Sequence, residues 1–136
     1  MNGLFAASDL KGPDIDLLQS PFLNRPIFGM VLMEGRLCFS YFPEFGLRNK
    51  LVKGGIGYWC FFEESFLSGL LRERILELPM FAPGNSVGYL LSERDREKAV
   101  LLFLKMIDEQ DSTYQYKFDL IRTYLTQLFH LVMRMG

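Results

Sequence analysis

Histidine is almost lacking from this chain: among its 136 residues there is one, His130. A metal centre of the kind that small β-barrels hold takes two or three histidines with a carboxylate, because neutral imidazoles supply most of the ligand field. Ser-His-Asp or Cys-His catalysis would depend on His130, beside which no nucleophile stands in a suitable sequence context. We therefore expect no metal, no cofactor and no enzymatic activity, and we expect His130 at the surface or at the edge of a dimer.

Cysteine and long apolar runs are also scarce. The two cysteines, Cys38 and Cys60, match no metal-binding or redox spacing, so buried free thiols in a reducing compartment are the favoured interpretation. The longest apolar stretches, such as "AVLLFL", fall far short of the roughly 18 residues that a membrane-spanning helix needs. The N-terminus has neither the basic start nor the continuous apolar segment of a signal peptide. We expect a cytoplasmic protein without membrane contact.

An excess of charge of one sign is lacking as well, with 15 lysines and arginines against 16 aspartates and glutamates. In the C-terminal half the two signs are interspersed, so no basic surface is predicted for nucleic acid. Hydrophobic residues, at 49%, suffice for one core, which favours a single domain over residues 1–136. The high aromatic content of 15% suits a sheet-lined interior.

A β-rich part is predicted over residues 27–62. The runs "IFGMVLM" (27–33) and "RLCFSYF" (36–42) are rich in bulky apolar side chains and are separated only by Glu34-Gly35. Because the glycine can take the positive φ of a tight turn, these runs predict an antiparallel hairpin.

A further strand is predicted over "IGYWCFF" (56–62), which is apolar at every position but one, as expected of a strand covered on both faces. The segments around these strands are less regular. Residues 1–26 contain three prolines and are expected to be an extended or loosely packed lead-in. Residues 43–55 are expected to form a loop with at most one short strand.

A helical part is predicted over residues 63–136. Apolar residues recur at helical spacing from Glu63 and stop at Pro79, which predicts one amphipathic helix over 63–78. A turn-rich connection follows over 79–91.

Two longer helices are predicted next. Ser92 with Asp95 three residues later resembles a capping box, which predicts a helix over 93–110. The final helix is expected over 114–135 and carries an apolar seam at alternating spacings of three and four residues. Because this stripe is wide enough for two partners, it predicts a symmetric homodimer. The interface candidates are Phe118, Ile121, Tyr124, Leu125, Leu128, Leu131, Val132 and Met135.

Three runs carry a resemblance to a known family: "GYWCFFEESFL", "LPMFAPGNSVGYLLSE" and "MIDEQDSTYQYKFDLIRTYLTQLFHLVMRMG", which together span about residues 57–136. They resemble the N-terminal effector-binding and dimerisation domain of AraC-type transcriptional regulators, in the form common among Bacteroidetes. The most specific run is "EQDSTYQYKFDLIRTYL". The resemblance implies a cupin-like barrel that holds a small effector, and two following helices that pair with those of a second subunit.

The expected fold is therefore α+β, an abbreviated cupin-like antiparallel β-barrel or sheet followed by two or three C-terminal helices. It is abbreviated because only 56 residues precede the strand "GYWCFF", fewer than family members usually give to the barrel. Inward-facing strand residues of a small barrel make an apolar cavity, and otherwise they pack as core. The candidates for an effector site are Met30, Leu32, Phe39, Tyr41, Trp59 and Phe61.

The expected function is that of a sensor and dimerisation domain of such a regulator. Full-length members continue into a basic domain with two helix-turn-helix motifs, so DNA contact is expected only through that domain, which is missing from the 136 residues. Two alternatives remain. One is a stand-alone oligomerising protein that pairs with related regulators and blocks them, and the other is a metal-free cupin-like enzyme.

Overall fold

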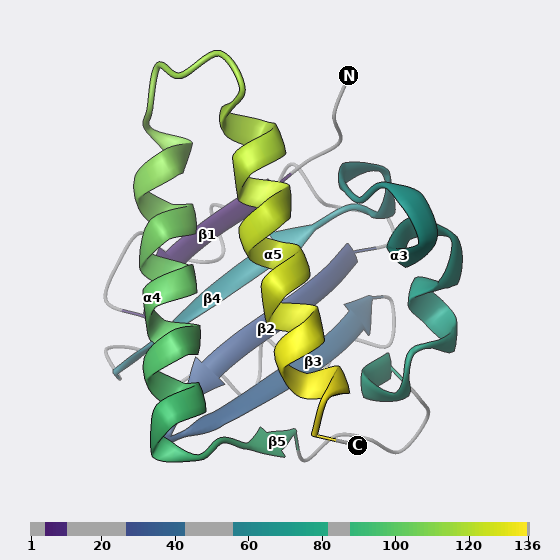
Figure 1. The fold of residues 1–136 in the computed structure, drawn as a ribbon, viewed down its shortest axis with the longest axis vertical. Coiled ribbons are helices and arrows are strands. Elements are labelled where there is room, and N and C mark those ends of the chain that lie inside the picture. The colour runs from purple at the N-terminus through teal and green to yellow at the C-terminus, as the bar shows by residue number, and fades with distance from the viewer. Residues whose placement is uncertain (1–4, 11–26, 43–55, 82–87, 136) are drawn as a thin grey trace.

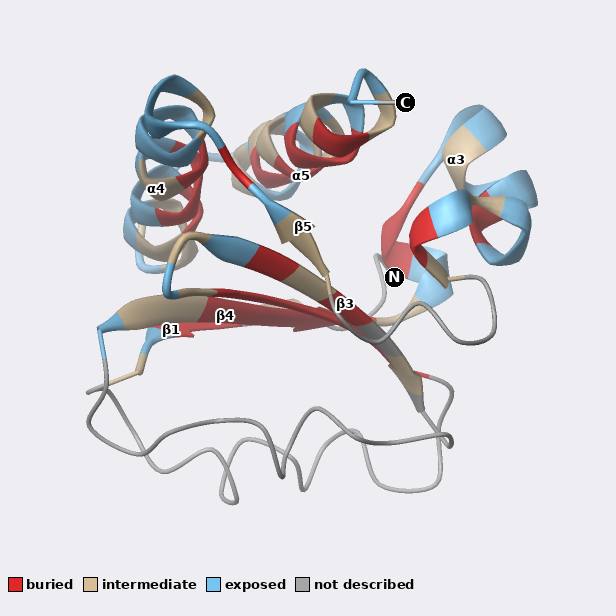
Figure 2. Cartoon of the chain, turned by 90° about the horizontal axis from the view of Figure 1, so that it is seen from below, coloured by how far each residue is buried: buried red, intermediate tan, exposed pale blue. Residues whose placement is uncertain are grey.

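A five-stranded antiparallel sheet forms the centre of the structure, which is a computed structural model describing residues 5–10, 27–42, 56–81 and 88–135. Helices α4 (Glu93–Gln110) and α5 (Lys117–Met133) lie side by side across one face of this sheet (Figures 1 and 2). The strands lie in the order β1 (Phe5–Asp9), β4 (Gly57–Phe62), β2 (Ile27–Met33), β3 (Arg36–Phe42) and β5 (Tyr89–Leu90). The two outer strands do not pair with each other, so the sheet is open. The α+β fold is thus confirmed, in its sheet form and not as a closed barrel.

The central strands agree closely with the prediction. β2 and β3 pair over their whole length, and Glu34 and Gly35 between them have φ values of 54° and 76°. Two consecutive positive φ angles are typical of a type I′ hairpin turn, whose twist matches that of the strands. The predicted hairpin is confirmed.

Strands β1 and β5, the two edges of the sheet, were not predicted. β1 lies in the segment that we expected to be a lead-in, and it pairs with β4 from Phe5 opposite Phe62 to Asp9 opposite Tyr58. β5 has only two residues and pairs with the start of β3. The expected loop over 43–55 lies outside the described residues.

Gln110 closes the outer edge of β1. Its side-chain amide accepts a hydrogen bond from the Ala7 backbone N–H at 2.8 Å and donates one to the Ala7 carbonyl at 2.9 Å. The amide thereby occupies the backbone groups that a further strand would use, and an edge strand without such cover is a template for aggregation. Gln110 also ties the last turn of α4 to the sheet.

Replacing Gln110 by alanine is expected to lower the free energy of unfolding by about 1–2 kcal/mol, because two hydrogen bonds to partly buried groups are lost. Hydrogen exchange of the Ala7 amide should accelerate more than that of amides in β2. Gln115→Ala is the matched control, since Gln115 is exposed in the α4–α5 turn. Equal stability of Gln110→Ala and Gln115→Ala would show that the bond pair does not hold the edge.

Both long helices are present. α4 spans Glu93–Gln110, as predicted, and the Ser92 hydroxyl accepts a hydrogen bond from the Asp95 N–H at 3.1 Å. This bond satisfies one of the free amides of the first turn.

α5 spans Lys117–Met133 and begins three residues later than predicted. The reason is that Ser112 stabilises a turn and not a helix start, because its hydroxyl accepts from the N–H of Tyr114. The Lys117 ammonium donates to the carbonyls of Gln110 and Ser112, at 3.1 and 3.2 Å. A cation is favourable there because the C-terminus of a helix carries partial negative charge.

The prediction of a single helix over 63–78 is wrong. The structure has short helical pieces instead: the 3-10 helices η2 (Glu64–Phe66), η3 (Ile75–Glu77) and η4 (Pro79–Phe81), with the helix α3 (Gly69–Arg74) among them. Ser68 has extended backbone angles and Gly69 has φ +63°, a conformation outside the right-handed helical region. The periodic apolar residues are therefore divided among separate turns.

The core lies between the sheet and the helices. Paired positions of an antiparallel sheet share a face, and the face that includes Phe28, Met30 and Leu32 packs against α4 and α5. The helices contribute Phe103 and Met106, both 0% exposed, together with the buried seam of α5. The opposite face holds Trp59 and Phe61, which are also buried, so β4 is covered on both faces as predicted.

Candidate functional site

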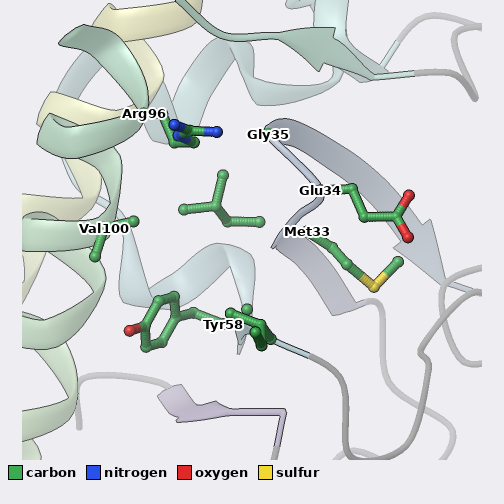
Figure 3. A pocket seen from close by; sticks show the side chains of 9 residues that line it. Met33, Glu34, Gly35, Tyr58, Arg96 and Val100 are labelled. Carbon is green, nitrogen blue, oxygen red and sulfur yellow. The ribbon is translucent and has the colours of Figure 1, made fainter. Parts of the chain in front are cut away.

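A groove of about 550 Å³ lies beside the β2–β3 turn, where the start of β4 faces α4 (Figure 3). It contains mostly apolar side chains and one arginine, and we call it the Arg96 groove. Its lining residues are Leu32, Met33, Glu34, Gly35, Ile56, Gly57, Tyr58, Arg96 and Val100. Ligand sites usually have this size and this combination of apolar walls with few polar groups.

The walls of the groove follow from local structure. Arg96 and Val100 are four residues apart on α4, so they project from the same side of that helix. A Cβ added at Gly57 would lie 2.2 Å from the Leu32 carbonyl oxygen, so only glycine allows β4 to pass this close to β2. At Gly35 a Cβ would lie 3.9 Å from Nη1 of Arg96, which places the guanidinium beside the hairpin turn.

Arg96 is the cation of this groove. The Arg96 side chain forms no ion pair or side-chain hydrogen bond within the described part of the chain. The Glu34 side chain points away from the cavity in Figure 3, whereas the Arg96 guanidinium lies at its upper wall. Leu32, Tyr58 and Val100 form the apolar remainder. The groove thus combines one available positive charge with apolar surface.

The predicted effector residues do not form one site. Met30, Leu32, Phe39 and Tyr41 lie on the helix-facing side of the sheet, and all but the half-buried Tyr41 are at most 8% exposed. Trp59 and Phe61 lie on the opposite face, since Trp59 pairs with Val31 and Phe61 with Gly29. Leu32 alone of the six lines the Arg96 groove.

Half of the predicted interface residues lie in the core of the monomer. Ile121, Leu125 and Leu128 are 0% exposed and Val132 is 2% exposed, packed in the cluster that includes the sheet. The other four remain accessible in part. Tyr124 and Leu131 are half-buried, and Phe118 and Met135 are exposed by 39% and 41%. Dimerisation itself stays a prediction.

The outer face of α4, turned away from the sheet, carries two exposed leucines that the sequence interpretation did not select. Leu101 is 52% exposed and Leu104 is 45% exposed. Next to them the Lys105 ammonium lies 5.6 Å from the ring centroid of Tyr124, on the neighbouring helix α5. Leu101, Leu104, Lys105 and Tyr124 are called the outer helix surface below.

The side chains considered for chemistry are those of Cys38, Cys60 and His130. Cys60 is fully buried and its pKa is raised by desolvation, so its thiol stays neutral and unreactive. Cys38 and Cys60 form no disulfide, in agreement with the expected free thiols, but only Cys60 is buried and Cys38 is partly exposed. His130 is exposed near the end of α5. Within the described ranges no three His, Cys, Asp or Glu residues group as metal ligands.

None of the described helices has the length and apolar character needed to cross a membrane. Comparison with models of protein families, with curated proteins and with solved structures finds no match to this chain.

Proposed function

We propose that this chain is the sensor and dimerisation domain of an AraC-type transcriptional regulator, acting in the cytoplasm as a homodimer that responds to a small effector. The observation that carries this proposal is the α4–α5 hairpin. The run "EQDSTYQYKFDLIRTYL", which carries the family resemblance, forms the end of α4, the turn and the first half of α5, and α4 displays leucines on its outer surface.

Residues of that run hold the hairpin on the rest of the fold. The Arg122 guanidinium donates to the Phe66 carbonyl and, through Nη1, to Asp119 at 2.7 Å. It also lies over the Phe66 ring, with Cζ 4.8 Å from the centroid. These contacts fix α5 against η2. The inner face of α5 therefore packs within one subunit, and the contact between subunits would use the outer helix surface.

A two-fold pairing through that surface fits its composition. Leu101 and Leu104 lie one turn apart at its middle, and exposed apolar residues flanked by charge are typical of association sites. Lysine and aspartate both occur beside them, at Lys105 and Asp108, so an isologous contact can match opposite charges. DNA would be contacted only by a separate domain.

Light scattering is expected to show a dimer for the parent at tens of micromolar and a folded monomer for Leu101→Glu/Leu104→Glu. The two carboxylates on each subunit would face those of the other subunit across the two-fold axis and repel them. The apolar contact between the leucines would also be lost. The circular dichroism spectrum should stay unchanged, because both leucines are exposed in the monomer.

The matched control is Leu70→Glu, which places the same charge on a leucine that is 70% exposed on α3. This variant should remain a dimer. A monomeric parent, or a dimer that persists in Leu101→Glu/Leu104→Glu, would contradict the outer helix surface as the interface.

Sequencing the native gene beyond the codon for Gly136 tests the proposal that the chain belongs to a transcriptional regulator. Codons that follow Gly136 in the native reading frame are expected to encode a basic domain with two helix-turn-helix motifs. A stop codon would instead favour the stand-alone inhibitor of related regulators.

A further inference from the structure

We propose that the Arg96 groove binds a small monocarboxylic acid with an apolar body, its carboxylate on Arg96 and its body against Leu32, Tyr58 and Val100. This inference rests on the proposed function, since it names the effector class of the sensor. It differs in position from a site inside a barrel, because the groove is formed between α4, the β2–β3 turn and the start of β4.

The charge of the groove selects an anion. Among the described residues that line the groove, Arg96 is the only cation, and its guanidinium pairs with none of them. A guanidinium presents parallel N–H donors that fit the two oxygens of a carboxylate. Arg96 is exposed on α4, so an anion can reach its guanidinium from solvent.

The number of charges limits the ligand to a monoanion. One arginine balances one negative charge, and no second cation is found among the described residues that line the groove. A phosphate ester carries nearly two charges at neutral pH and needs more donors than this groove offers. A carboxylate is therefore favoured over a phosphate.

The walls of the groove determine the remainder of the ligand. Leu32, Val100 and the ring of Tyr58 provide apolar contact, and the groove of about 550 Å³ is large enough for a ring or a short branched chain. Such a body gains affinity by removing apolar surface from water. Phenylacetate is the simplest probe that combines both parts.

The test is a titration of the ¹⁵N-labelled chain with phenylacetate, followed by the backbone shifts of Gly35, Gly57 and Val100 and by the Nε signal of Arg96. Saturable shifts confined to these residues are expected. Phenylacetamide, which has the same shape without the charge, should bind at least about tenfold more weakly, and phenyl phosphate should not bind more tightly than the acid.

Two variants separate charge from packing. Arg96→Gln keeps a long polar side chain but removes the positive charge. It should lower the affinity for phenylacetate at least about tenfold and leave the affinity for phenylacetamide unchanged. Arg94→Gln removes an exposed arginine outside the groove on the same helix and should leave both affinities as in the parent.

The inference is overturned if acid and amide bind equally, if Arg96→Gln binds the acid as the parent does, or if phenylacetate and hexanoate both leave these signals unchanged at millimolar concentration. Tighter binding of phenyl phosphate would also overturn it and would indicate a phosphate site. These results are independent of the oligomeric state. A monomer that binds phenylacetate through Arg96 would retain this inference and contradict the proposed dimer.

Discussion

Leu128→Glu is expected to unfold the chain and not merely to separate subunits. Leu128 is 0% exposed and packs with residues of the sheet and of α4 in one cluster. Losing the apolar side chain and burying an unpaired carboxylate costs about 5 kcal/mol or more in the free energy of unfolding. Since single domains are stable by roughly 5–15 kcal/mol, most of the native population would be lost. Circular dichroism and urea unfolding measure this directly.

The neighbouring variant Gln127→Glu is the control, because Gln127 is exposed on the same helix turn. It should unfold at nearly the same urea concentration as the parent. A folded, monomeric Leu128→Glu would contradict the structure, since it would mean that α5 can present its seam to a partner without cost to the monomer.

The contrast between Leu128 and Leu104 shows what periodicity can predict. The three-and-four spacing in α5 correctly indicates one apolar face on that helix, and the structure covers this face with the sheet. Spacing alone does not say whether a sheet or a second subunit provides the cover. On α4 the exposed Leu101 and Leu104 fall outside the apolar stripe, so the same rule does not select them.

Local signals in the sequence were sufficient for the central hairpin and for α4. Glu34-Gly35 specifies its turn through backbone conformation, and Ser92 starts its helix by capping. β1 was missed because its residues pair with β4, 49 to 57 positions away, and because two of its five residues are alanines. The prediction of one helix over 63–78 was wrong because Gly69 takes a positive φ.

The Arg96 groove could not be predicted for a related reason. Arg96 and Val100 share a helix side, which the sequence does indicate. Their position over the β2–β3 turn depends on where α4 crosses the sheet, and that follows from long-range packing, including the bond pair between Gln110 and Ala7. The role of Gly57 in the close approach of β4 to β2 could not be predicted from the sequence, because a glycine before an apolar run is also common in loops.

Gly57→Ala is expected to have the second large effect. The added Cβ would lie 2.2 Å from the Leu32 carbonyl oxygen and 3.3 Å from its carbon, both backbone atoms in the neighbouring strand. Backbone cannot rotate aside as a side chain can, so β4 and β2 must separate at this point. We expect a loss of about 3 kcal/mol in the free energy of unfolding, measured by urea denaturation.

Gly69→Ala provides the matched control for this substitution. Gly69 has φ +63°, yet a Cβ there would meet no atom within 4 Å, so the variant measures backbone strain without collision. Its expected cost is about 1 kcal/mol. Because Gly57 also lines the Arg96 groove, Gly57→Ala should shift the amide signals of Tyr58 and Val100, whereas Gly69→Ala should leave them in place. If the two variants lose equal stability, the close approach of β4 to β2 is not what requires glycine at position 57.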